Sequence, residues 1–402
     1  MDFSKRPART YLAGAALSYI GTAIVPVALS FAVLESGYGA GGLGLVLAAQ
    51  TVPTILLLLF AGIAGDRWSR RVIMISADFF RAFAQTILAA CLIHGHTPLV
   101  LIVAVSALIG MGNAFFQPAS GGFLTEIVPR EQLGRTNGLL RTSNALAMVI
   151  GPAIGGAIVA TFSPGWGIAL DAVSYLASAA CLLAIHSPAK LAPLPSAKKS
   201  ARRDLVEAFL ELRKTRWLGL IIAQYGLLNM AAIAPFNVIA PAIFSTSPGG
   251  AGAWSMLLSG IGAGAVLGAL ACARHQPRRL LLGVEAAATM LTAPIFLLAL
   301  DAPFALIFAG SFIFGIGAAM LSVLTITAIQ KEIAPAMLSR IMAIVQLANI
   351  GLLPVGYILA APAMSLLGAR TSLILSGVCV LASVAILCGM PEIRRFENRK
   401  TW

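Results

Sequence analysis

The stretch Gly62-Ile63-Ala64-Gly65-Asp66-Arg67-Trp68-Ser69-Arg70-Arg71 sets one acidic and three basic residues between two long apolar runs. Residues 43–63 before it and residues 72–93 after it are each long enough to span a bilayer as a helix. The stretch therefore predicts a short turn between two membrane helices. Arginine-rich turns stay on the cytoplasmic side of a membrane, so we expect this turn there.

The pattern Gly-x-x-x-Asp-Arg-x-Gly-Arg-Arg at this place resembles the signature of the major facilitator superfamily of transporters. The matching residues here are Gly62, Asp66, Arg67, Arg70 and Arg71. Ser69 stands where that family usually has glycine, so we expect a tighter or strained turn. The resemblance implies a gate in which Asp66 holds the inner ends of two helix bundles together, against a helix that begins near Arg340. The alternative is a solvated basic loop that serves topology only.

The composition indicates a polytopic membrane protein. Of 402 residues, 59% are hydrophobic and 11% are charged, whereas soluble domains carry roughly a quarter charged residues. The net charge of +13 is spread through short loops, as topology determinants are, so nucleic acid is not an expected partner. We expect no metal and no cofactor, because the five cysteines lie in apolar runs and no nucleotide-binding loop occurs.

Hydropathy predicts an all-α membrane protein with twelve transmembrane helices, and the resemblance implies that they form two pseudo-symmetric six-helix bundles. Residues 1–186 and 217–402 would form the bundles, and 187–216 a cytoplasmic linker whose second half reads as an amphipathic surface helix. Lysine and arginine concentrate in alternate connections, which places both termini in the cytoplasm of a bacterial inner membrane. The predicted spans are 11–34, 43–64, 72–94, 98–118, 137–161, 167–186, 217–240, 253–273, 280–300, 304–328, 341–361 and 371–390.

Charged residues inside the spans are costly in lipid, which makes them candidates for function. Asp78 and Arg81, three apart on one helix face, either neutralise each other or form a proton site. Arg141 is expected to start its helix and to meet Asp78 or an anionic substrate. Asp171 and Glu285 are further candidates for proton coupling, ranked below Asp78 because they lie nearer the span ends. The alternatives are a wet position at the outer rim for Asp171 and a side chain that reaches the inner surface for Glu285. Asp78 is therefore the leading candidate for the proton carrier.

A second motif, Gly151-Pro152-Ala153-Ile154-Gly155-Gly156, resembles the Gly-Pro-x-x-Gly-Gly signature of proton-driven exporters in the superfamily. Its alternative role is ordinary helix packing, because proline and glycine are frequent in membrane helices. Residues 77–82 and 115–119 resemble the macrolide and siderophore exporter branch.

We therefore expect a monomeric secondary transporter that exports amphipathic small molecules in exchange for protons. An importer of a metabolite, a membrane-embedded enzyme and a sensor are the alternatives. Sparse polar groups among aromatic side chains favour a moderately hydrophobic substrate. The expected pathway residues are Asn113, Phe115, Phe116, Gln117, Asn144, Gln224, Tyr225, Asn229, Phe236, Asn237, Gln346 and Asn349.

Overall fold

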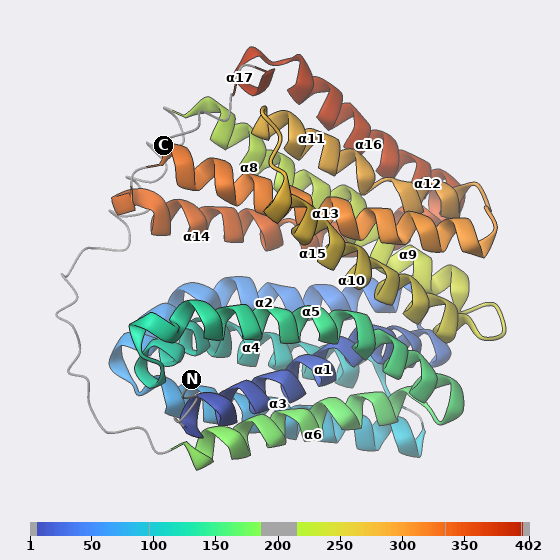
Figure 1. Cartoon of the computed structure of the whole chain (residues 1–402). Helices are drawn as coiled ribbons and strands as arrows, with labels where there is room; N and C mark the ends of the chain where they lie inside the picture. The colour runs from blue at the N-terminus through green and yellow to red at the C-terminus, as the bar shows by residue number, and fades with distance from the viewer. Residues whose placement is uncertain (1–5, 96, 186–214, 334, 395, 397–402) are drawn as a thin grey trace. The chain divides into compact units, whose positions relative to one another are not determined.

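The structure is a computed structural model that describes residues 6–95, 97–185, 215–333, 335–394 and 396. Within these ranges, the side chains of residues 6, 59, 61–67, 335, 336 and 339 are not described. The predicted linker and its amphipathic helix lie almost wholly outside the described residues. Helices are the secondary structure of the described chain (Figure 1), as the hydrogen-bonding needs of a backbone in lipid require.

The chain divides into two compact units, Met1–Pro195 with Pro241–Ser259, and Ser196–Ala240 with Gly260–Trp402. In the first unit, α1 and α3 both pack against α6, α2 packs against α4, and α5 packs against α1 (Figure 1). Its first six helices are α1 Arg6–Glu35, α2 Gly39–Arg67, α3 Arg70–His94, α4 Leu99–Ile127, α5 Arg130–Thr161 and α6 Pro164–Ala184.

The remaining helices are more often interrupted. They are α8 Arg216–Leu228, the π-helix η1 Asn229–Ile233, α9 Ala234–Phe244, α10 Gly250–Arg274, α11 Leu280–Met290, α12 Ala293–Ala299, α13 Phe304–Glu332, α14 Pro335–Gly351, α15 Leu353–Leu367, α16 Ala369–Gly389 and α17 Pro391–Arg394.

Twelve segments of the described chain are long and apolar enough to cross a membrane, which confirms the predicted number of spans. Several are longer than predicted: the fourth covers Leu99–Ile127 and the fifth Arg130–Thr161. About 20 helical residues cross the apolar core of a bilayer, so these two helices continue past it. Arg141 therefore lies well inside α5 and does not start a helix, contrary to the sequence prediction.

The turn that joins α2 and α3 is shorter than the quoted motif. Helix α2 continues through the motif to Arg67, and α3 begins at Arg70, so only Trp68 and Ser69 lie between them. Ser69 has φ −59° and ψ 124°, an ordinary extended conformation open to any residue. The expected strain from replacing glycine at this position is therefore wrong.

Two spans of the second unit are broken at proline. Pro294 lies in the first turn of α12 and Pro354 in the first turn of α15, each after a short break from the preceding helix. Proline has no N–H to donate to the preceding turn and clashes with its carbonyl, so a helix restarts readily at such a residue. Sequence hydropathy sees one apolar run at each place and cannot detect the break.

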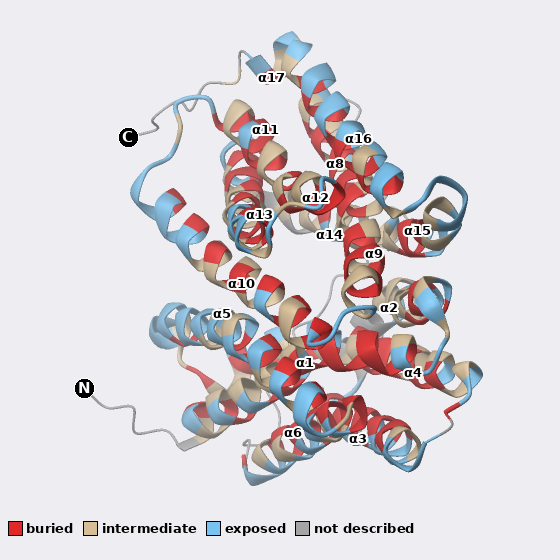
Figure 2. Ribbon diagram, turned by 90° about the vertical axis from the view of Figure 1, so that its right-hand side faces the viewer, coloured by how far each residue is buried: buried red, intermediate tan, exposed pale blue. Residues whose placement is uncertain are grey.

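Burial divides each helix into an inner and an outer face. On α3 the buried residues include Met74, Asp78 and Arg81, whereas Phe79 and Phe83 are exposed. Figure 2 shows this division along α3 and α6, with buried residues facing neighbouring helices. Exposed aromatic side chains on a membrane helix are the surface that lipid covers, and the polar side chains lie on the other face.

Glycines permit close crossings between helices in both units. A Cβ on Gly110 of α4 would overlap the Gln50 carbonyl of α2, and a Cβ on Gly315 of α13 would overlap the Ile261 carbonyl of α10. At the first crossing, the Thr54 hydroxyl hydrogen-bonds the carbonyls of both Gln50 and Gly110 at 2.9 Å. Small residues at such interfaces bring backbones together, which is a main source of helix association in membranes.

Gly110→Ala should destabilise the protein, because the added methyl group meets backbone that cannot rotate away. Overpacking of this kind costs roughly 1–3 kcal/mol. Gly121→Ala is the matched control on the same helix, because a Cβ there would find no atom within 4 Å. Thermal unfolding of the purified variants in detergent measures the effect. Equal melting temperatures for the two variants would contradict the crossing.

Candidate functional site

The two arginines at the start of α3 tie three helix ends together in the first unit. Arg70 Nη1 lies 3.3 Å from Glu126 Oε1 in the last turn of α4. Arg71 donates from Nε to the Leu182 carbonyl at 2.9 Å and from Nη2 to the Leu183 carbonyl at 2.8 Å. Arg71 thus satisfies carbonyls that the end of α6 leaves without helical partners, where a cation also suits the helix dipole.

The other residues of the predicted gate lie in α2 and α14. Gly62, Asp66 and Arg67 lie in α2, where their side chains are outside the described part. Arg340 lies in α14 and donates to Met337 Sδ at 3.3 Å. The gate between Asp66 and the region of Arg340 therefore stays a prediction.

A buried ionic cluster occupies the middle of the first unit. Arg81 of α3 forms an ion pair with Asp78 of the same helix, and its Nη1 donates to Asn113 Oδ1 of α4 at 2.8 Å. The guanidinium also lies 4.4 Å from the ring centroid of Phe116 on α4 and 4.2 Å from that of Tyr175 on α6. Planar arginine suits such a position, because it can stack on rings while its edge donates hydrogen bonds.

Asp78 and Arg81 were predicted either to neutralise each other or to form a proton site. They form an ion pair, and Arg141 forms none with Asp78 among the described residues. The role of Asp78 as a proton carrier stays a prediction. Its ion pair instead supports a structural role, in which one guanidinium holds α3, α4 and α6 together.

Asp171 on α6 is fully buried, so the expected wet position at an outer rim is wrong. Its Oδ2 accepts a hydrogen bond from Gln85 Nε2 of α3 at 2.8 Å, and Ser174 Oγ lies 3.4 Å from its Oδ1. Sequence reasoning missed Gln85 and Tyr175. Their signal was spacing: Gln85 follows Arg81 by four residues, and Tyr175 follows Asp171 by four, so each pair shares a helix face.

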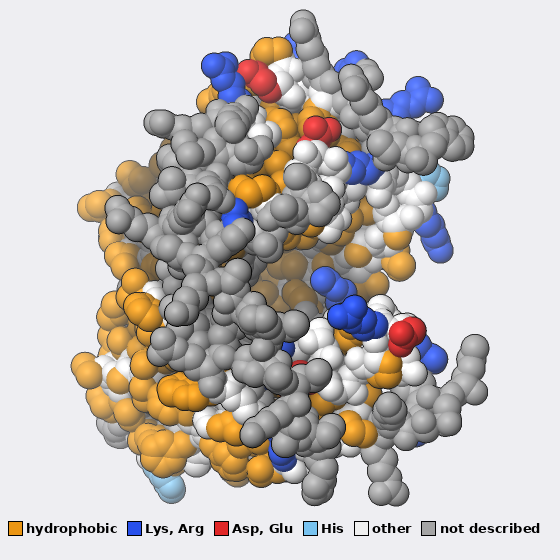
Figure 3. All heavy atoms as spheres, turned by 90° about the vertical axis from the view of Figure 1, so that its left-hand side faces the viewer, with side chains coloured by type: hydrophobic (Ala, Val, Ile, Leu, Met, Phe, Trp, Pro, Cys, Tyr) orange, Lys and Arg blue, Asp and Glu red, His pale blue; other side chains and the backbone are white. Residues whose placement is uncertain are grey.

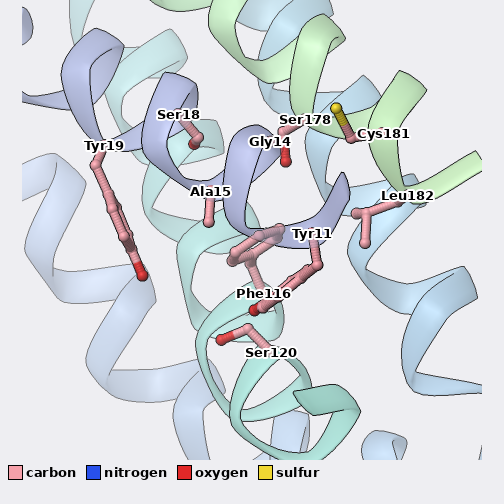
Figure 4. A pocket seen from close by; sticks show the side chains of 10 residues that line it. All are labelled: Tyr11, Gly14, Ala15, Ser18, Tyr19, Phe116, Ser120, Ser178, Cys181 and Leu182. Carbon is pink, nitrogen blue, oxygen red and sulfur yellow. The ribbon is translucent and has the colours of Figure 1, made fainter. Parts of the chain in front are cut away.

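A small pocket opens beside this cluster. Tyr11 and Tyr19 come from α1, Phe116 and Ser120 from α4, and Ser178 from α6 (Figure 4). The ring of Phe116 that lines the pocket is the one that stacks on Arg81. Hydroxyl groups from three helices therefore surround a space that adjoins the ion pair. The full lining is Tyr11, Gly14, Ala15, Ser18, Tyr19, Phe116, Ser120, Ser178, Cys181 and Leu182.

The Gly-Pro motif of α5 packs against α1. A Cβ on Gly151 would overlap Ala23, and one on Gly155 would lie 3.0 Å from the Ile24 carbonyl. Pro152 and Gly156 are buried in the same helix, which runs without interruption through the motif. Close packing, the alternative role considered for this motif, is thus what the described contacts support.

The second unit buries a carboxyl group of its own. Glu285 of α11 is 1% exposed, so the expectation that it reaches the inner surface is wrong. Gln224 of α8 donates from Nε2 to Glu285 Oε2 at 2.7 Å. The next residue, Tyr225, donates its hydroxyl to the Leu321 carbonyl of α13 at 3.1 Å. Side chains of α8 thereby contact both α11 and α13, and Gln224 and Tyr225 are residues that the sequence placed on the pathway.

Other predicted pathway residues of the second unit also contact one another. Asn229 Nδ2 donates to the Tyr225 carbonyl at 2.8 Å and to Asn349 Oδ1 at 3.1 Å, where the helix of the seventh span becomes the π-helix η1. Asn237 is half-buried, and the rings of Phe236 and Phe314 stack with centroids 5.9 Å apart. Phe236 is therefore part of the unit's own core.

Four predicted site residues are exposed within membrane spans: Gln117, Arg141, Asn144 and Gln346. Phe115 is half-buried and packs on the apolar cluster that includes Tyr11 and Phe123. An exposed arginine or amide in a span does not suit lipid, so such side chains indicate water-filled surroundings.

Comparison with known proteins agrees with this architecture. The profile of the Major Facilitator Superfamily matches residues 11–353. This chain belongs to the Major Facilitator Superfamily. Membership identifies it as a transporter and not an enzyme.

Two curated relatives of this superfamily member align over nearly their whole length. Macrolide efflux protein A of Streptococcus pyogenes is 25% identical over 408 residues, covering 96% of each chain. Multidrug efflux pump Tap of Mycobacterium bovis is 24% identical, covering 98% of this chain and 96% of Tap. The crystal structure of nucleoside transporter NupG matches with a TM-score of 0.76 at 13% identity, covering 98% of this chain and 100% of that chain, which shows the shared fold. The resemblance to the macrolide-exporter branch is thus confirmed.

Asp78→Asn should destabilise the protein by on the order of 3 kcal/mol, because it leaves Arg81 buried without a counter-ion. The neutral pair Asp78→Asn with Arg81→Gln should be less destabilised than the sum of the two single variants. Unfolding of the four proteins in detergent gives the coupling free energy. Arg81→Lys serves as the matched control, because it keeps the charge and loses the planar stacking. Additive single effects would contradict a coupled pair.

Proposed function

We propose that this chain is a proton-coupled exporter of amphipathic small molecules that works by alternating access. The observation that carries the proposal is that carboxyl groups are buried inside membrane spans of both units. Asp78 and Asp171 are fully buried in the first unit, and Glu285 is buried in the second. Ionisable residues inside membrane spans are candidates for function, and proton relays are one of the roles they serve.

Exposed polar side chains support a water-filled pathway through the spans. Arg141 and Asn144 are exposed on α5, Gln117 on α4 and Gln346 on α14. Aromatic and apolar residues outnumber them on the same helices. A cavity with few polar groups suits a moderately hydrophobic ligand better than a sugar.

The names of the relatives support the substrate class. Macrolide efflux protein A and multidrug efflux pump Tap align over nearly the whole chain, although identity is only 25% and 24%. A macrolide is a large amphipathic molecule, which agrees with the polarity argued above. We therefore infer an amphipathic antibiotic or similar natural product as the substrate, with export as the direction.

We place both termini in the cytoplasm and the protein in a bacterial inner membrane as a monomer. Taken by itself, each unit shows Lys and Arg side chains in the view of Figure 3, which supports a positively charged inner side. We also propose that Asp66 and the region of Arg340 close the inner gate. In Asp66→Asn the charge is lost and the shape is kept, so transport should fall while the protein still inserts.

A proteoliposome assay tests the proposed function. Vesicles with an acidic lumen should accumulate a labelled macrolide against its gradient, because protons leaving down their gradient drive the drug inward by exchange. A proton ionophore should abolish the accumulation. The matched control is the same vesicle with an alkaline lumen, which drives a symporter and not an antiporter.

Three outcomes would contradict the proposal. Accumulation with an alkaline lumen would favour the importer. Accumulation that the ionophore does not reduce would exclude proton coupling. Equal accumulation of the labelled macrolide in vesicles with wild-type and with Asp66→Asn protein would reject the proposed inner gate. It would leave the proposed antiport standing.

A further inference from the structure

Glu285 and Gln224 form a carboxyl–amide pair in the interior of the second unit. Their side chains come from α11 and α8, and both residues are buried, at 1% and 4% exposure. One hydrogen bond joins them, from Gln224 Nε2 to Glu285 Oε2 at 2.7 Å. Among the described residues, no basic side chain forms an ion pair with Glu285.

The pair leaves two oxygen atoms without partners. Glu285 Oε1 and Gln224 Oε1 are both buried, and neither has a hydrogen-bond partner in the described chain. If the Glu285 carboxyl is ionised, Glu285 Oε1 and Gln224 Oε1 are both hydrogen-bond acceptors. Neither can then donate a hydrogen bond to the other. A buried acceptor without a donor costs roughly 1–3 kcal/mol, and more if it carries charge.

One proton removes both deficits. We propose that Glu285 is protonated in this conformation and donates its hydroxyl hydrogen to the Gln224 amide oxygen. The carboxyl oxygen that was an unpaired acceptor becomes a donor, and the amide oxygen gains the partner it lacks. The same result follows if the Gln224 amide is turned over. Its oxygen would then lie at hydrogen-bonding distance from a carboxyl oxygen, and two oxygens meet there only with a hydrogen between them.

The other buried carboxyls have different surroundings. Asp78 has Arg81 as a counter-ion, although its Oδ2 has no hydrogen-bond partner among the described residues. Asp171 accepts a hydrogen bond from Gln85 through Oδ2, and Ser174 Oγ, which donates to the Asp171 backbone carbonyl, lies 3.4 Å from Oδ1. Among the described residues Glu285 has an amide beside it and no ion-pair partner, which suits a neutral acid in a buried site.

The titratable groups on the helices packed around Glu285 do not supply a positive charge that would pair with an ionised Glu285. Tyr225 of α8 is engaged with the Leu321 carbonyl, and Cys388 of α16 lies within electrostatic reach of Glu285. Arg394 of α17 donates to the Cys388 carbonyl. The remaining charged groups lie at helix ends: Arg216 of α8 pairs with Glu392 of α17 at 3.9 Å, and Lys331 is exposed at the end of α13.

The protonation of Glu285 does not depend on the proposed function. The role of Glu285 as a proton carrier does depend on it. If the protein is a proton-coupled exporter, Glu285 is the group that carries the proton in this state. It would release the proton when the second unit changes conformation and water or a cation reaches the carboxyl. Glu285 then replaces Asp78 as the leading carrier.

Infrared spectroscopy tests the proton directly, without transport. A protonated buried carboxyl has a C=O stretching band separate from those of carboxylates and amides. Purified wild-type protein at neutral pH should show this band, and Glu285→Gln should lose it. Asp171→Asn is the matched control, because it removes another buried carboxyl and should leave the band unchanged. Gln224→Met should shift the band, because the carbonyl loses its N–H donor.

A neutral-pH band that persists in Glu285→Gln, or no band in the wild type, would overturn the inference. If Glu285→Gln does not fold, Glu285→Asp takes its place, because it keeps a carboxyl group on a shorter side chain. Its infrared band should be shifted from that of the wild type. An unshifted band in Glu285→Asp would also overturn the inference. A band that depends on Glu285 together with macrolide accumulation that ignores the pH gradient would leave the protonated pair standing and reject the proposed coupling.

Discussion

The ion pair of Arg81 and Asp78 is the interaction on which the first unit depends. A guanidinium inside a membrane span has no water to satisfy it, so every favourable contact must come from the protein. Here the contacts are Asp78, Asn113 and the rings of Phe116 and Tyr175, which together engage α3, α4 and α6. The Arg81 guanidinium contacts side chains from all three helices. Moving any one of these helices alone would therefore leave a buried cation without some of its partners.

The second unit is built differently, and the difference has a functional meaning. Its spans break at Pro294 and Pro354 and pass through a π-helix at Asn229, where the first unit has continuous helices. Its buried carboxyl, Glu285, contacts an amide, and no basic side chain of the described chain forms an ion pair with it. Interrupted helices change shape more easily than continuous ones, and a neutral acid gains or loses charge when its surroundings change. The proposal therefore assigns a fixed ion pair to the first unit and a proton-binding carboxyl among interrupted helices to the second.

Sequence reasoning predicted most of the fold and less of the site. Apolar runs between basic turns predicted the twelve spans, because the bilayer fixes how long such a run must be. The same reasoning failed for Asp171 and Glu285, which it placed near water and the structure buries. The position of a residue near the end of an apolar run does not show which neighbouring helix buries its side chain. Gln85 and Tyr175 were missed for the same reason, although their four-residue spacing from Arg81 and Asp171 was visible in the sequence.

Proton release on substrate binding tests most directly whether the second unit carries the proton. Purified protein in weakly buffered detergent, with a pH-indicator dye, reports protons that leave when a macrolide is added. The account predicts release from the wild type and from Asp78→Asn, and none from Glu285→Gln that still binds the macrolide. Release from Glu285→Gln equal to that of the wild type, or its loss only in Asp78→Asn, would contradict the account.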